Sequence, residues 1–77
     1  MHKKKIRLIS VHDILIFHEC AEAVCGNVTV KKGNFEINGK SLLGILSLDV
    51  ASGIEVTYPA NALEFEEYIS TFEDEKL

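Results

Sequence analysis

Two serines stand directly before apolar runs, where each suits the start of a helix. The hydroxyl oxygen of Ser41 can accept a hydrogen bond from the free amides of a first helical turn, so we expect Ser41 to cap a short helix that ends near Asp49. A phosphate on Ser41 would meet the same amides and the positive end of the helix dipole. Gly44 lies inside this helix, where glycine costs stability unless another group approaches closely. The pattern predicts a serine that can carry phosphate without breaking its helix.

The second helix start lies at Ser10. Ser10 and Asp13 have the spacing of a capping box, in which each side chain bonds the backbone amide of the other residue, with Asp in place of the usual Glu. The predicted helix runs to about Cys25, and Gly26 and Asn27 end it. Its core-facing stripe consists of Ile14, Phe17, Ala21, Val24 and Cys25. Ser10 is therefore interpreted as an ordinary helix cap.

The histidines and cysteines offer little further chemistry at their positions in the sequence. His12 lies off the apolar stripe of its helix and is predicted to point into solvent, whereas His18 flanks the stripe as a boundary histidine. Cys20 and Cys25 are about 140° apart around a helix axis, which is poorly placed for a disulfide. No His or Cys cluster has metal-ligand spacing. We expect free thiols in a reducing compartment, with no metal and no cofactor.

Length and charge narrow the class of protein. A chain of 77 residues, 47% hydrophobic and 26% charged, predicts a single domain spanning 1–77. The net charge of −4 argues against nucleic acid as a partner. No apolar run approaches the roughly 18 residues of a membrane span, and no targeting segment is recognised, so the sequence predicts a cytoplasmic protein without a membrane partner. Basic residues gather at the start and acidic residues at the end: Lys3, Lys4, Lys5 and Arg7, then Glu64, Glu66, Glu67, Glu73, Asp74 and Glu75.

Alternation of polar and apolar residues predicts four strands, at 4–9, 27–31, 34–38 and 54–58. Each strand has one apolar and one polar face. The residues predicted to point inward from the last three strands are Val28, Val30, Phe35, Ile37, Ile54, Val56 and Tyr58. A turn at residues 32–33 joins two of these strands into a hairpin.

A last helix is predicted after Asn61, where Asn61 and Glu64 have the pattern of a capping box. Its apolar stripe consists of Phe65, Tyr68, Ile69 and Phe72. The element order is therefore βαββαβα. Strands with one polar face favour an antiparallel sheet that is wet on one side and covered by helices on the other.

The chain resembles HPr, the phosphocarrier of the bacterial sugar phosphotransferase system, most clearly over residues 39–48. There, Lys-Ser-Leu-Leu-Gly-Ile-Leu-Ser-Leu stands beside the family's Lys-Ser-Ile-Met-Gly-Val-Met-Ser-Leu, and residues 51–56 match the turn and strand that follow. The resemblance implies an α+β fold, an open-faced two-layer sandwich of four antiparallel strands with three helices on one face.

The resemblance also indicates which chemistry has been replaced. The family's phosphate-bearing histidine falls on Ser10, its arginine on His12 and its proline on Asp13. A serine hydroxyl without an adjacent base is a poor nucleophile, and the Asp13 carboxylate repels phosphate. His12 is the remaining candidate acceptor. The sequence therefore predicts that histidine phosphotransfer is absent and that the protein is not an enzyme.

The candidate functional residues are then Ser41, for regulatory phosphorylation, and Lys40, Leu43 and Leu46, for docking. In Gram-positive members of the family a dedicated kinase phosphorylates the matching serine, and the modified protein binds a transcription regulator. Leu43 and Leu46 either form an apolar docking patch or only shield the core below them. Family members commonly place basic residues on the exposed side of the first helix, whereas the equivalent positions here include Glu19 and Glu22, which disfavours the usual phosphate donor.

Three functions follow from these observations. The first is a regulatory or binding module for a phosphotransferase-system or regulatory protein, switched at Ser41. The second is an active phosphocarrier that uses His12. The third is a small structural subunit that oligomerises through a sheet edge or through Leu43 and Leu46, and the oligomeric state is left open. Phosphate transfer and light scattering separate the three.

Overall fold

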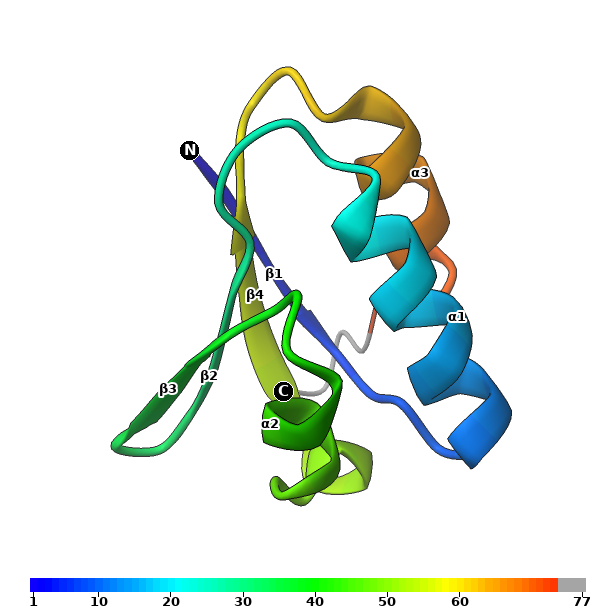
Figure 1. Ribbon diagram of the computed structural model, residues 1–77, viewed down its shortest axis with the longest axis vertical. Coiled ribbons are helices and arrows are strands. Elements are labelled where there is room, and N and C mark those ends of the chain that lie inside the picture. Colours follow the sequence, from blue (N-terminus) through cyan, green and yellow to red (C-terminus); the bar gives the residue numbers. More distant parts are fainter. Residues whose placement is uncertain (74–77) are drawn as a thin grey trace.

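The computed structural model describes residues 1–73, and the acidic residues Asp74 and Glu75 lie outside the described residues. The helices and strands follow the predicted order, with one short 3-10 helix, η1, added before the last strand. Figure 1 shows β1 (His2–Ile6), α1 (Val11–Glu22), β2 (Thr29–Lys32), β3 (Phe35–Asn38), α2 (Leu42–Leu46), η1 (Val50–Ser52), β4 (Ile54–Tyr58) and α3 (Leu63–Ser70). None of the helices within residues 1–73 combines the length and the hydropathy of a membrane span.

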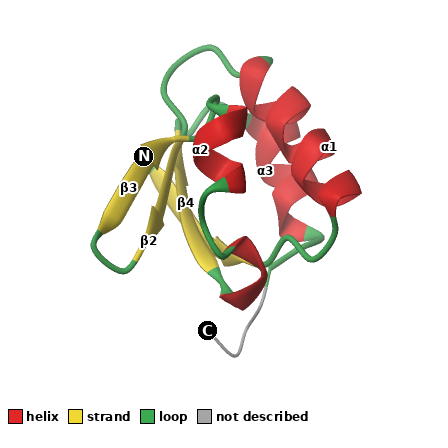
Figure 2. Cartoon of the chain, turned by 60° about the horizontal axis from the view of Figure 1, so that its bottom comes forward, coloured by secondary structure: helices red, strands yellow, loops and turns green. Residues whose placement is uncertain are grey.

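One antiparallel sheet holds the four strands in the order β1-β4-β2-β3. All three α-helices lie on the same side of this sheet (Figure 2), with α1 beside α3 and α2 close to the β3 edge. The opposite face carries no helix in the described part of the chain. The predicted open-faced α+β sandwich is confirmed.

The core lies between the sheet and the helices. Phe17 of α1, Phe65 of α3 and Tyr58 of β4 meet there, with ring centroids 5.7 Å apart for the two phenylalanines and 5.6 Å for Tyr58 and Phe65. The buried apolar residues are Ile6, Leu8, Ile14, Phe17, Ala21, Val24, Val28, Val30, Ile45, Val50, Ile54, Val56, Tyr58, Phe65 and Ile69. Removing this surface from water is the main force that holds helices to sheet.

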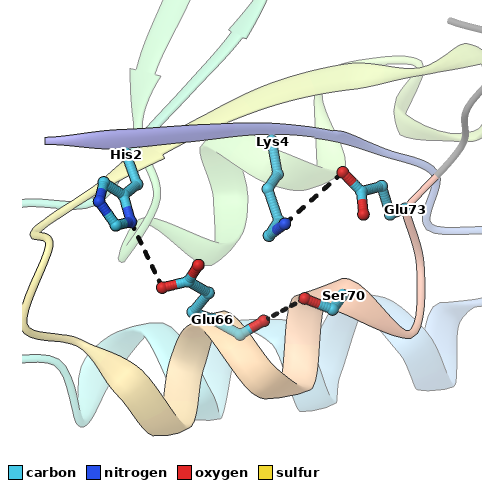
Figure 3. Close-up of polar contacts among 5 residues, drawn as sticks. All are labelled: His2, Lys4, Glu66, Ser70 and Glu73. Atoms are coloured by element: carbon cyan, nitrogen blue, oxygen red, sulfur yellow. Dashed lines mark hydrogen bonds and ion pairs between the residues drawn. The ribbon is translucent and has the colours of Figure 1, made fainter.

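Polar contacts tie α3 to the edge strand β1 (Figure 3). His2 Nδ1 lies 3.4 Å from Glu66 Oε2, and Lys4 Nζ lies 3.6 Å from Glu73 Oε2. The Ser70 hydroxyl donates to the backbone carbonyl of Glu66 at 2.7 Å. Alternate residues of β1 therefore point toward α3, and the residues between them point to the open face of the sheet.

The first strand lies earlier in the chain than predicted. The prediction was 4–9, whereas β1 spans His2–Ile6. Past Ile6 the chain leaves the sheet, because the Leu8 amide donates to the Val50 carbonyl at 3.2 Å and Ile9 is exposed. β2 starts two residues later and ends one residue later than the predicted 27–31, β3 starts one residue later than predicted, and β4 has the predicted bounds.

The first helix ends at Glu22, so the prediction that it reaches Cys25 is wrong. The Val24 amide bonds the Ala21 carbonyl at 3.1 Å, which tightens the chain out of the α-helical spacing. Cys25 is exposed and does not belong to the core stripe, contrary to the prediction. The angular argument about the two cysteines therefore does not apply, although both are free thiols.

Two other local predictions are wrong. Phe35 was expected to point into the core, but its side chain is 68% exposed, because the tip of the β2–β3 hairpin projects away from the helices (Figure 1). Asn61 was expected to cap the last helix, but the N-cap is Ala62 and no side chain bonds the first turn there. The apolar stripe of α3 is confirmed, with Phe65 and Ile69 buried.

Candidate functional site

The start of α1 is a complete capping box. The Ser10 hydroxyl accepts from the Asp13 amide at 3.1 Å. In return, Asp13 Oδ2 accepts from the amides of Ser10 at 3.4 Å and of Ile9 at 3.3 Å. The predicted role of Ser10 as a helix cap is confirmed, with Asp13 as its reciprocal partner.

This capping box changes what the start of α1 can bind. Helix N-terminal amides attract anions because they point outward and lie at the positive end of the dipole. Here a carboxylate of the chain itself bonds the amides of Ile9 and Ser10. A phosphate brought to Ser10 would meet that negative charge at close range, so the geometry disfavours an anion at this position.

His12 lies on the first turn of α1 and is exposed, as predicted. Its imidazole makes no hydrogen bond or ion pair to other described residues. A phosphate on this ring would be solvated by water rather than hydrogen-bonded by other described residues. The structure therefore offers His12 a free approach but no group to stabilise a phosphorylated state.

The start of α2 uses the same serine cap without a carboxylate. The Ser41 hydroxyl accepts from the Gly44 amide at 3.2 Å, which confirms the predicted cap. No acidic residue lies in the first turn. A Cβ on Gly44 would lie 3.2 Å from Ile37 Cδ1, so the close approach expected at this glycine comes from β3.

The apolar side chains of α2 divide between buried and exposed positions. Ile45 is buried, and Leu42 packs partly against the core. Leu43 is 81% exposed and Leu46 is 47% exposed, so neither is covered by the described residues. Both side chains are thus available to a partner, as a docking patch requires.

Lys40 does not reach toward the Ser41 cap. Its ammonium donates to the Val24 carbonyl at 2.7 Å, at the C-terminal end of α1. His18 Nε2 lies 3.0 Å from the Lys40 carbonyl and 3.1 Å from Glu22 Oε1, two acceptors that both require a proton on this nitrogen. Lys40 and His18 therefore bind the end of α1 to the segment that starts α2. The boundary position predicted for His18 is confirmed by its partial burial.

Val11 and Leu15 are two further exposed apolar residues, on α1, that were missed in the sequence. They are 64% and 46% exposed, and they lie three to seven residues before His18 on one side of α1. Since His18 contacts Lys40 at the start of α2, this side of α1 faces α2. The signal was two apolar residues outside the core stripe of an otherwise amphipathic helix. We call Val11, Leu15, Leu43 and Leu46 the α1–α2 apolar surface.

Away from this surface, a cavity of about 440 Å³ lies between the end of α1 and the start of α3. Cys20, Cys25 and Phe65 are among its lining residues. Burial, and then the Glu19 carboxylate, raise the pKa of the Cys20 thiol. Cys20 is therefore held in the protonated, poorly nucleophilic form. Residues 1–73 contain no cluster of three or more His, Cys, Asp and Glu side chains that suits a metal ion.

Comparison with known proteins identifies the fold. No family model and no curated protein sequence matches the chain. The structure of HPr-C-His from Thermoanaerobacter tengcongensis matches with a TM-score of 0.74 at 20% identity, over 92% of this chain and 93% of that chain. Phosphocarrier protein HPr from Bacillus anthracis str. Ames matches with a TM-score of 0.68 at 18% identity, over 95% and 96%. The chain has the fold of HPr phosphocarrier proteins, which confirms the fold that the sequence resemblance implied.

Proposed function

We propose that this chain is an HPr-like binding module of the sugar phosphotransferase system, regulated by phosphorylation of Ser41 and inactive in histidine phosphotransfer. Its proposed setting is the cytoplasm, and its proposed partner is a phosphotransferase-system or regulatory protein. The observation that carries the proposal is the start of α2, where the exposed Ser41 hydroxyl stands beside the exposed Leu43 and Leu46.

The α1–α2 apolar surface supports docking of a protein. Full burial of one Leu or Val side chain stabilises a complex by about 1.5–3 kcal/mol, and α1 and α2 each expose two such side chains. Lys40 directly precedes the Ser41 cap, and its proposed part in docking comes from its position rather than its charge, since its ammonium bonds the Val24 carbonyl just after α1. Glu19 and Glu22 are exposed on α1, so the module suits a partner without an acidic docking patch.

Phosphorylation of Ser41 would act locally. A phosphate adds about −1.5 to −2 charges and strong acceptor oxygens. At this position it adjoins the Gly44 amide and the positive end of α2, so the helix tolerates it. It also places an anion beside Leu43 and Leu46, which raises the cost of burying them against an apolar partner and favours a partner that supplies a cation.

The first experiment presents the protein to a Gram-positive HPr-type kinase with ATP and locates the phosphate by mass spectrometry. We expect modification at Ser41 and none in Ser41→Ala. Ser47→Ala is the matched control, because Ser47 lies at the other end of the same helix. A protein that stays unmodified, or that carries phosphate on Ser47, contradicts the proposed regulation.

The docking surface is tested with the same kinase. Leu43→Ser and Leu46→Ser should each lower kcat/KM by about tenfold if the surface carries binding energy. Leu63→Ser is the control, because Leu63 is an exposed leucine on α3 whose exposure, 69%, lies between those of Leu46 and Leu43. Equal losses in all three variants would mean that the α1–α2 apolar surface has no special role.

The phosphocarrier alternative depends on His12, which is exposed at the first turn of α1. Incubation with phosphoenolpyruvate and the general enzyme of the phosphotransferase system should leave no acid-labile phosphate on the protein. Phosphate transfer that disappears in His12→Ala would replace the proposed function with this alternative. Light scattering of the parent and of Leu43→Ser tests the oligomeric alternative in the same samples.

A further inference from the structure

A hollow on the open face of the sheet is lined by three lysines. It has a volume of about 270 Å³ and lies where β4 begins and the β2–β3 hairpin turns. Lys5, Lys31 and Lys32 line it, and Glu55 is the acidic residue among the lining residues. The hollow belongs to the face opposite the helices, so it is independent of the α1–α2 apolar surface.

Strand register brings two of these lysines to either side of one carboxylate. Glu55 of β4 lies directly opposite Lys5 of β1 and directly opposite Lys31 of β2. Directly opposed residues of antiparallel strands have Cβ atoms about 5 Å apart on the same face. Within residues 1–73, no ion pair of 4.0 Å or less joins Glu55 to Lys5 or Lys31. Both ammonium groups therefore remain free to meet a ligand.

Lys32 supplies a third, fixed ammonium group. Its Nζ donates to the Ser52 hydroxyl and, at 3.4 Å, to the Gly53 carbonyl. These bonds hold the lysine against the turn that leads into β4. Two neutral acceptors leave its positive charge uncompensated, so the charge adds to the field of the hollow.

The backbone around the hollow is open. A Cβ built on Gly33 would meet no atom within 4 Å, and Gly53 adopts φ 115°, where other residues are strained. Neither glycine has a side chain that would fill the hollow. A small molecule can therefore approach the lysines without meeting a side chain at either glycine.

We propose that this hollow binds a small phosphate-bearing anion with two or more negative charges, such as pyrophosphate. Lys5 and Lys31 flank Glu55 on the open face and Lys32 is held at the adjoining turn, so lysines outnumber carboxylates around the hollow in a chain whose net charge is −4. Charge complementarity selects an anion, and a volume of about 270 Å³ suits a small molecule rather than a protein segment. Lys5 and Lys31 are exposed, so binding weakens as salt concentration rises.

The test is an NMR titration of the ¹⁵N-labelled full chain with pyrophosphate at constant ionic strength and without divalent metal. We expect saturable shifts of the Gly33, Gly53 and Ile54 amides. Shifts that rise linearly without saturation, or that spread over all lysine-bearing strands, indicate nonspecific attraction and overturn the proposal.

Three variants that each remove one charge sharpen the test. Lys31→Gln should weaken binding by about threefold or more, the size of one exposed charge contact. Lys3→Gln removes the same charge from the same open face, but Lys3 pairs with Thr57 outside the hollow, so affinity should change little. Glu55→Gln should tighten binding, because it removes the one carboxylate that opposes the ligand. Equal losses for Lys3→Gln and Lys31→Gln, or weaker binding by Glu55→Gln, would refute the site.

Discussion

The starts of α1 and α2 use the same cap and have opposite electrostatics. In each, a serine hydroxyl accepts from the amide three residues later, at 3.1 Å for Ser10 and 3.2 Å for Ser41. At α1, the Asp13 carboxylate bonds back to the amides before the helix. At α2, the corresponding position is Gly44, which has no side chain. The N-terminus of α1 is thus already neutralised by the Asp13 carboxylate, whereas the N-terminus of α2 can accept an added anion.

The two helices also differ in what holds them in place. α1 has 12 residues and a complete capping box. α2 has only five residues, too few to be stable alone, so it depends on contacts with the sheet. Ile37 of β3 supplies such a contact, next to Gly44, and Gly39 holds the segment that leads into α2 because its amide donates to the Val28 carbonyl at 2.6 Å. A regulatory site on α2 is therefore built on tertiary packing, whereas the start of α1 is built on local sequence.

The largest expected effect tests that dependence on packing. In Gly39→Ala the new Cβ would lie 2.5 Å from Val28 Cγ1 and 3.0 Å from the Val28 carbonyl oxygen. We expect a loss of about 1–3 kcal/mol in the free energy of unfolding, measured by urea denaturation. Gly44→Ala is the control: its Cβ would lie 3.2 Å from both Ile37 Cδ1 and Ser41 Oγ, which is less close than the contacts at Gly39, and alanine gains helix propensity, so it should cost less. Equal costs would mean that α2 is not positioned through Gly39.

Aspartate at the two serines tests the electrostatic difference. Asp is as good a helix cap as Ser, so Ser41→Asp should retain stability within about 0.5 kcal/mol. Ser10→Asp should lose about 1 kcal/mol or more, because the new carboxylate lies beside that of Asp13. Urea denaturation at neutral pH measures both variants. The loss at Ser10 should shrink at pH values where the carboxylates are protonated, and a loss independent of pH would argue against charge as the cause.

A smaller effect is expected where the two helices meet. Lys40→Met keeps the aliphatic stem of the side chain but removes the bond to the Val24 carbonyl. We expect a loss of about 0.5–1.5 kcal/mol, and reduced hydrogen-exchange protection at residues 23–26. Lys31→Met on the open face is the control. Unchanged protection in Lys40→Met would show that Lys40 does not join α1 to α2.

The smallest expected effect is a change in the pKa of Tyr68, which is sensitive to the Asp13 carboxylate at the start of α1. Burial raises the pKa of Tyr68 to about 12, with further contributions from Cys20 and Asp13. The folded state therefore prefers the neutral phenol, and Tyr68 destabilises the fold as pH rises from about 10 toward 12. Asp13→Asn should lower the pKa of Tyr68 slightly, measured by spectroscopic titration, and Ser41→Asp should leave it unchanged. A shift in both variants would mean that Tyr68 does not distinguish the two helix starts.

The sequence predicted those parts of the fold that depend on local patterns. Ser10 and Ser41 were recognised because an N-cap acts within three residues, and β4 because its alternation is undisturbed. Phe35 was misplaced because alternation gives the face of a strand but not how far the helices cover it. The cap at Asn61 failed because the preceding turn, closed by Ala62 and Pro59, delays the helix by one residue.

The candidate site was predicted in its residues but not in its arrangement. The exposure of Leu43 and Leu46 depends on the orientation in which α2 packs against β3, and no local sequence pattern specifies that orientation. The bond of the Lys40 ammonium to the Val24 carbonyl, just after α1, likewise depends on tertiary structure. The exposure of Val11 and Leu15 was not predicted. Helical periodicity identifies the stripe of α1 that faces the core, but not whether apolar residues beside that stripe are covered by another element.

The strand order has a consequence for how the chain folds. β2 and β3 are neighbours in sequence, but β1 pairs with β4, so that His2 lies opposite Tyr58. Until β4 has been synthesised, β1 has no partner, and its later pairing must close a loop of most of the chain. We expect the β2–β3 hairpin to form early in refolding and the β1–β4 pair to limit the rate. In stopped-flow experiments, Ile6→Val should then slow refolding more than Ile37→Val does.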